Sequence, residues 1–203
     1  MLASSTIIQD IDAMRKAGLA TQGFFYCDFR EDQKRVMRGL LSSLLVQLCH
    51  QSDSYYNVLL KFYEGHADGS QHPSDDALTG CLKDLLKLPG LAPVYLIVDA
   101  LDECPNASAI PSARVKVLNL VKELIESQIS NLHICVTSRP EPDIKDVLSH
   151  LIFRSVSLHD ESGQKKDIED YIKLVISTNP ENEWESEDMQ RVIGVLTEKS
   201  DGM

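Results

Sequence analysis

The chain lacks the sequence patterns that most directly announce a function or a destination. None of its ten glycines is followed by lysine, so it contains no phosphate-cradling loop of the form G-x-x-x-x-G-K-[ST]. No apolar run approaches the roughly 18 residues that a membrane-spanning helix needs, and we expect no membrane span. The first dozen residues include Asp10 and Asp12 but neither Lys nor Arg, which argues against a secretory signal.

Cysteine and positive charge are also sparse. The five cysteines lie at least 22 positions apart, so no C-x-x-C pair exists. Scattered cysteines in odd number favour reduced thiols in an intracellular, cytoplasmic setting over a disulfide framework or a zinc site. The 20 Lys and Arg are outnumbered by 31 Asp and Glu, which gives a net charge of −11. This balance argues against a nucleic-acid partner, because binding to a phosphate backbone requires positive charge.

Helical and strand-like patterns alternate along the chain, which is typical of an α/β protein with a mostly parallel sheet and helices on both faces. The predicted strands are residues 24–27, 94–98, 133–137 and 153–158, and the predicted helices are centred on residues 7–17, 36–48, 78–86, 115–125, 167–176 and 186–198.

The only candidate domain boundary is a change of composition near Asp160. From there to the end, 12 acidic residues face 5 basic ones. We therefore expect a core domain at residues 1–160, followed by the start of a helical region at residues 161–203.

The most informative segment is Asp99-Ala100-Leu101-Asp102-Glu103, which follows the apolar run 94–98. A buried strand that ends in carboxylates can hold magnesium, because this hard cation prefers oxygen ligands. The alternative for Asp99 is a helix-capping or turn aspartate. For Asp102 and Glu103, the alternative is a solvated acidic loop that leads to Pro105.

A second apolar run, residues 133–137, ends in Ser138-Arg139-Pro140. Pro140 disfavours the helical conformation at Arg139, so this residue should remain extended at the strand tip. Its guanidinium could bind phosphate oxygens or could instead neutralise Asp99 or Glu103. Because ligands bind beyond the carboxyl ends of strands in open α/β sheets, the two runs predict a shared site.

Residues 94–103 resemble the magnesium-binding strand of NACHT ATPases, and residues 133–140 resemble their arginine-bearing sensor strand. The greatest similarity is to nephrocystin-like NACHT modules of filamentous fungi, which belong to the STAND class of P-loop NTPases. The resemblance covers nearly the whole chain, because further stretches agree with it: residues 4–11, 24–29, 167–172 and 199–203.

The resemblance implies a role for each candidate site residue. Asp99 would bind magnesium through water, and Asp102 or Glu103 would orient the attacking water. Arg139 would sense the phosphate, with Thr137 and Ser138 as further candidates for nucleotide contact. The alternative for these two hydroxyls is the capping of backbone groups at the strand end.

The resemblance also implies a three-layer P-loop NTPase-like sheet whose first strand, the one before the phosphate loop, is missing. In that sheet order, the first three predicted strands are neighbours and the fourth is displaced or loosely paired. Met1 would fall just after the lost Lys-Ser/Thr pair. In the intact family, Mg²⁺ accompanies ATP or GTP, and we expect the 203 residues alone to bind neither at micromolar concentration and to show no turnover. The implied partners are further copies of the chain or other signalling domains. The implied architecture includes ankyrin or WD repeats. The alternatives are a non-catalytic interaction or regulatory module of the same fold and a truncated gene model without independent activity.

Overall fold

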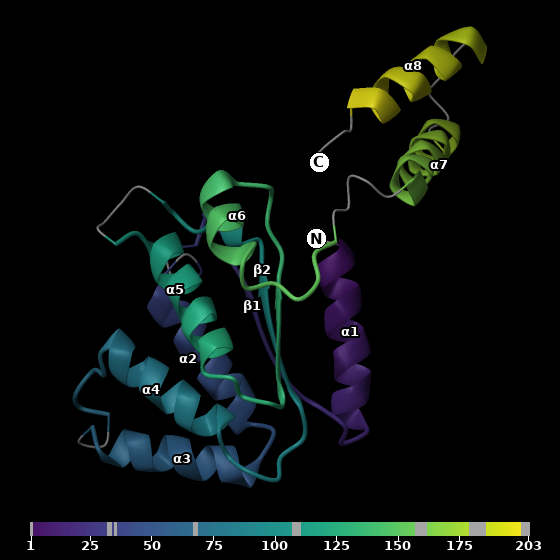
Figure 1. Ribbon diagram of the computed structural model, residues 1–203. Coiled ribbons are helices and arrows are strands. Elements are labelled where there is room, and N and C mark those ends of the chain that lie inside the picture. The colour runs from purple at the N-terminus through teal and green to yellow at the C-terminus, as the bar shows by residue number, and fades with distance from the viewer. Residues whose placement is uncertain are drawn as a thin grey trace. The chain divides into compact units, whose positions relative to one another are not determined.

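The computed structural model describes residues 2–31, 34, 36–66, 69–106, 111–156, 162–178 and 186–199 (Figure 1). The chain divides into two compact units, Met1–Leu151 and Ile152–Met203. The assignment of domains to residues 1–160 and 161–203 stays a prediction. Within the described part of the chain, no helix is both long and apolar enough to cross a lipid bilayer.

The first unit is built on a parallel sheet of three strands in the order β1-β2-β3. The strands are β1 (Thr21–Tyr26), β2 (Val94–Asp99) and β3 (Leu132–Val136). The predicted α/β class and the neighbouring placement of the first three strands are confirmed. The fourth predicted strand is wrong at residues 153–156, which form no strand, and residues 157–158 lie outside the described residues. Apolar alternation at 153–158 was its only support, and Phe153 is fully exposed.

Serine side chains fix where several helices of this unit begin. The side chains of Ser52, Ser74 and Ser112 accept hydrogen bonds from backbone N–H groups of the first turn, which would otherwise lack partners. The helices are α1 (Leu2–Lys16), α2 (Met37–Cys49), α3 (Asp53–Glu64), α4 (Asp75–Leu86), α5 (Ala113–Glu126) and α6 (Pro142–Leu148).

Side chains on β2 alternate between two apolar clusters, as the pleat of a strand requires. Leu96 packs in the larger cluster with residues of α2, α4 and α5, whereas Ile97 packs with Ile11 of α1. Figure 1 shows the corresponding layers, with α1 on one side of the sheet and α2, α4 and α5 on the other. This burial from both faces is typical of parallel sheets.

The outer edge of β1 is covered by side-chain amides rather than by another strand. Gln51 of α2 accepts from the N–H of Gln22 at 2.9 Å and donates to its carbonyl at 2.6 Å. Gln47 makes the same pair of hydrogen bonds with Phe24, at 3.0 and 2.7 Å. The two glutamines thus replace the ladder of a neighbouring strand and close this edge to further pairing.

The second unit contains two amphipathic helices, α7 (Ser162–Thr178) and α8 (Ser186–Lys199), which contact each other. Ile193 is buried, and Lys173 pairs with Glu169 one turn away on α7. The two helices agree with the helical patterns expected near residues 167–176 and 186–198.

Candidate functional site

The carboxyl ends of β2 and β3 bring Asp99 and Thr137 together. The Thr137 hydroxyl donates to Oδ1 of Asp99 at 2.5 Å and accepts from the N–H of Ala100 at 3.0 Å. The Asp99 side chain lies within the fold, since the residue is only 5% exposed. The Thr137 hydroxyl therefore caps the backbone after β2, in line with the alternative given for it, and also bonds the buried carboxylate; its contact with a nucleotide stays a prediction.

The chain turns sharply after Asp99 and presents the two following carboxylates. Ala100 has the left-handed conformation, with φ 55° and ψ 48°, and it leads into the 3₁₀ turn η2 (Leu101–Glu103). Leu101 is fully buried, and its N–H donates to the Thr137 carbonyl at 2.9 Å. This anchor fixes the turn, so that Asp102 and Glu103 stand at the sheet's carboxyl edge.

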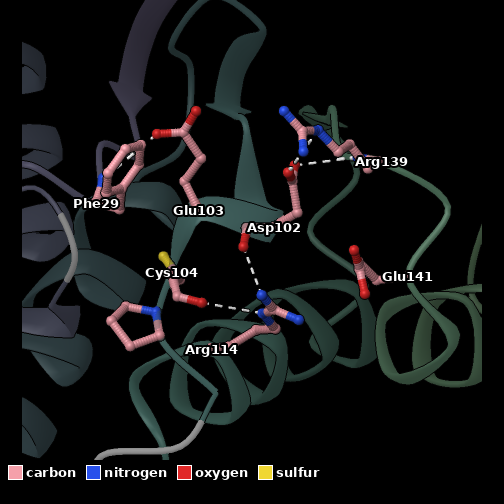
Figure 2. Close-up of a pocket in the computed structure, with 8 residues that line it drawn as sticks. Phe29, Asp102, Glu103, Cys104, Arg114, Arg139 and Glu141 are labelled. Carbon is pink, nitrogen blue, oxygen red and sulfur yellow. Dashed lines mark hydrogen bonds and ion pairs between the residues drawn. The ribbon is translucent and has the colours of Figure 1, made fainter. Parts of the chain in front are cut away.

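Arg139 contacts Asp102 from the neighbouring strand tip. Its backbone N–H donates to Oδ1 of Asp102 at 3.1 Å, and its Nε lies 3.5 Å from Oδ2 (Figure 2). The Arg139 side chain is 77% exposed, whereas that of Asp102 is 10% exposed. The alternative of an ion pair named Asp99 or Glu103 as the partner of Arg139, and this is wrong: the partner is Asp102. Ser138, which directly precedes Arg139 in the chain, is exposed.

Glu103 points towards a different segment, the one that follows β1. Its Oε2 accepts from the N–H of Phe29 at 3.3 Å, and Figure 2 shows the two residues facing each other. Asp102 and Glu103 thus diverge: one contacts the β3 side of the site and the other contacts the β1 side. The structure therefore gives Asp102 and Glu103 different partners, whereas the sequence could not distinguish their roles.

Arg114 is a site residue that the sequence analysis did not find. From the start of α5 it donates to the backbone carbonyls of Asp102, at 2.5 Å, and of Cys104, at 3.0 Å. It also pairs with Asp143 of α6 at 3.2 Å, and its side chain is only 11% exposed. This fork holds the acidic turn from beneath in Figure 2. No pattern of residue types in the sequence predicts these contacts of Arg114, because two of its acceptors are backbone carbonyls, which every residue carries.

A hollow of about 380 Å³ lies among these groups, and its lining includes Arg139, the acidic turn and Phe29. Asp99 and Thr137 are not among the residues that line it. The site therefore has two levels: a buried Asp99–Thr137 pair at the strand ends and an open hollow beside it. The lining residues are Phe29, Asp102, Glu103, Cys104, Pro105, Arg114, Arg139 and Glu141.

The donor atoms suit the protein's share of a magnesium–nucleotide site, but not a complete metal cage. Among the described residues, no three His, Cys, Asp or Glu side chains gather closely enough to hold a metal ion. Magnesium that travels with a nucleotide needs only one or two protein carboxylates, because phosphates and water supply its other ligands. Asp99, with the Thr137 hydroxyl beside it, fits that smaller requirement.

Comparisons with known proteins give one result. A family model described as Nephrocystin 3, N-terminal, matches residues 1–139, a stretch that includes both strand ends and the acidic turn. Neither the curated proteins nor the solved structures contain a match to the chain.

Proposed function

The chain belongs to the Nephrocystin 3, N-terminal family, and from this membership we propose that it is part of a NACHT-type signal-transduction NTPase module. In this proposal, the ends of β2 and β3 are the magnesium-binding and sensor strands of a nucleotide site. Nucleotide exchange and slow hydrolysis would switch the self-association of a larger signalling protein.

The observation that supports the proposal best is the meeting of complementary groups at one edge of a parallel sheet. Asp99 is buried against Thr137, and the exposed Arg139 reaches Asp102 from the adjacent strand tip. Carboxylates and an exposed guanidinium are groups that suit a magnesium–phosphate ligand. Ligands of open α/β sheets bind beyond this edge of the strands.

Each residue has a distinct task in the proposed site. Asp99 would orient water molecules around the metal, and Thr137 would hold its carboxylate in place. Arg139 would leave Asp102 for a phosphate oxygen and so free the Asp102 carboxylate to orient the attacking water. Glu103 is the other candidate for that last task, with its carboxylate now held by Phe29 N–H. Magnesium, when bound with the nucleotide, would neutralise charge that develops on the phosphates.

We propose that this chain alone binds nucleotide weakly. A phosphate loop supplies backbone N–H groups and a lysine to the phosphates, and no such loop occurs among the 203 residues. Three lost charge-assisted hydrogen bonds at about 1.5 kcal/mol each amount to roughly 4.5 kcal/mol. That loss corresponds to about a thousandfold in affinity. The expected dissociation constant is therefore millimolar rather than micromolar, without measurable turnover.

Equilibrium dialysis with millimolar Mg·ATP or Mg·GTP tests the proposal. We expect saturable binding that chelation of magnesium abolishes and that Asp99→Asn removes. The matched control is Asp84→Asn, an exposed position on α4, which should bind as the unmodified chain does. Binding that is unaffected by Asp99→Asn would contradict the metal role. Micromolar affinity would show that other residues cradle the phosphates.

A non-catalytic interaction module of the same fold is the second candidate, and one observation favours it. The functional groups of the site already satisfy one another: Asp99 through Thr137, Asp102 through Arg139 and Glu103 through Phe29. Such pairing is compatible with a purely structural role of these residues, and equally with a nucleotide site that holds no ligand. The dialysis experiment separates the two, because an interaction module has no magnesium-dependent nucleotide binding to lose.

A further inference from the structure

Two cysteine thiols that the proposed nucleotide site does not use lie in contact beside the acidic turn. Cys27 directly follows β1, and Cys104 directly follows Glu103. Their Sγ atoms are 3.3 Å apart, in a hydrogen bond donated by the Cys104 thiol. They are 4% and 2% exposed, and all five cysteines of the chain are free thiols.

Hydrogen bonds join the backbone segments that carry Cys27 and Cys104 to their surroundings and to each other. The N–H of Cys27 donates to the Asp99 carbonyl at 3.0 Å, which extends the pairing of β1 with β2. The Phe29–Glu103 hydrogen bond lies just beyond it, and Arg114 holds the Cys104 carbonyl. The sulfur atoms need to approach by only about 1.2 Å to reach the length of a disulfide bond.

We propose that Cys27 and Cys104 are a redox-active dithiol that hydrogen peroxide converts to a reversible intramolecular disulfide. This modification ties the end of β1 to the turn that carries Asp102 and Glu103. Cys104 lines the hollow of the candidate site, but neither sulfur has a role in the proposed nucleotide binding, so the disulfide should form without nucleotide.

The chemistry balances with peroxide as the only oxidant. The Cys104 thiolate attacks one peroxide oxygen, the O–O bond breaks, and the departing hydroxide takes a proton to become water. Cys104 is then a sulfenic acid. The Cys27 sulfur attacks the Cys104 sulfur, the S–O bond breaks, and the Cys27 proton leaves with the hydroxyl as a second water molecule. Two electrons pass from the sulfurs to the peroxide. A dithiol reductant returns them.

The environment favours Cys104 as the thiol that reacts first. When Cys104 loses its proton, the Cys27 thiol can donate to the thiolate, and this contact lowers the pKa of Cys104; the positive charge of Arg114 acts in the same direction. The same contact raises the pKa of Cys27. Burial raises the pKa of Cys49 and Cys81 to about 11 and also raises that of Cys135. Peroxide is small enough to reach a buried sulfur that a larger disulfide oxidant would miss.

Peptide mapping of the folded chain tests this inference, because trypsin places Cys27 in residues 17–30 and Cys104 in residues 88–114, with each remaining cysteine in another peptide. The folded chain is treated with hydrogen peroxide, and the peroxide is removed. Free thiols are then blocked with N-ethylmaleimide in denaturant, and digestion proceeds without reductant. We expect loss of two of the five blocked thiols and a joined pair of these two peptides, lighter by two hydrogens than their sum. Dithiothreitol should separate them.

Two variants sharpen the result. Cys27→Ser should abolish the joined peptides and leave Cys104 as a sulfenic acid, which dimedone traps when it is added with denaturant. Cys81→Ser should leave the link intact. The map of the unmodified chain decides the question even if a variant fails to fold. Blocked Cys27 and Cys104 in the oxidised sample, a link through another cysteine, or a link that forms only in denaturant would overturn the inference.

Discussion

At the scale of single residues, the turn that presents the acidic side chains depends on a strained alanine. Ala100 has φ 55° and ψ 48°, a conformation that costs an L-residue about 1–2 kcal/mol and that glycine adopts freely. Leu101 and Thr137 hold it there through backbone and hydroxyl hydrogen bonds.

Ala100→Gly should therefore stabilise the fold. Relief of strain exceeds the greater chain entropy of glycine, so we expect the free energy of unfolding to rise by about 0.5–1 kcal/mol. Ala13→Gly, on the exposed side of α1, is the matched control and should lower it by about 1 kcal/mol. Urea unfolding measures both. Equal losses at the two positions would mean that the left-handed turn is not formed in solution.

Thr137→Val tests the buried pair at the strand ends. The substitution keeps the shape but leaves both Oδ1 of Asp99 and the N–H of Ala100 without their hydroxyl partner. We expect the free energy of unfolding to fall by about 1–3 kcal/mol, because buried polar groups are costly when unpaired. Thr79→Val on α4 removes a hydroxyl that bonds only its own helix, to Asp75, and should cost less. An equal loss would count against a special Asp99–Thr137 contact.

Sequence patterns predicted the site's strand-end residues better than the contacts between them. An acidic cluster after one apolar run and an arginine after the next place Asp99, Asp102, Glu103 and Arg139 at one sheet edge, because parallel strands end on the same side. They do not predict which carboxylate Arg139 meets, nor the fork of Arg114, because both depend on the path of the turn after Asp99.

At the scale of elements, the two edges of the sheet differ. Along the outer edge of β1, the side chains of Gln47 on α2 and of Gln51 make the backbone hydrogen bonds that a neighbouring strand would make, to Phe24 and Gln22. Along β3, the described residues provide no further strand. The α2 helix thus both fills the core with leucines and terminates the sheet on one side.

Gln47→Ala and Gln51→Ala should each expose this edge. Each removes two hydrogen bonds to the β1 backbone, and we expect a loss of about 1–3 kcal/mol in the free energy of unfolding. The amides of Phe24 and Gln22, respectively, should exchange faster with solvent. Gln71→Ala, at an exposed loop position, is the control and should change neither quantity. Unchanged exchange at β1 in the two variants would contradict the capped edge.

Helical periodicity identified α1, α2, α4 and α5 but not α3 or α6. The sequence of α3 does carry a helical pattern. After the capping Ser52, apolar residues recur at helical spacing, as Tyr55, Val58, Leu59 and Phe62. The α6 helix is only seven residues long, too short for a periodic pattern. Proline at its start is the one local signal. The strand expected at 153–158 failed because alternation alone carries no information about a pairing partner.

At the scale of the whole molecule, the buried apolar clusters of the sheet lie entirely within residues 1–151. The family match covers residues 1–139 of this unit. The described carboxylates and Arg139 of the candidate site belong to the same unit, so the proposed nucleotide chemistry requires no residue of α7 or α8. An acidic net charge of −11 opposes a phosphate-bearing ligand at long range, which makes magnesium and Arg139 the more necessary.

The most direct test of the central claim is an amide-resolved NMR titration of the chain with Mg·ATP, repeated with magnesium chelated. If the ends of β2 and β3 form a magnesium–nucleotide site, the largest shifts should map to Ala100–Glu103 and Thr137–Arg139, saturate in the millimolar range and vanish without magnesium. Shifts that are absent at these concentrations, that map elsewhere on the chain or that persist under chelation would contradict the account.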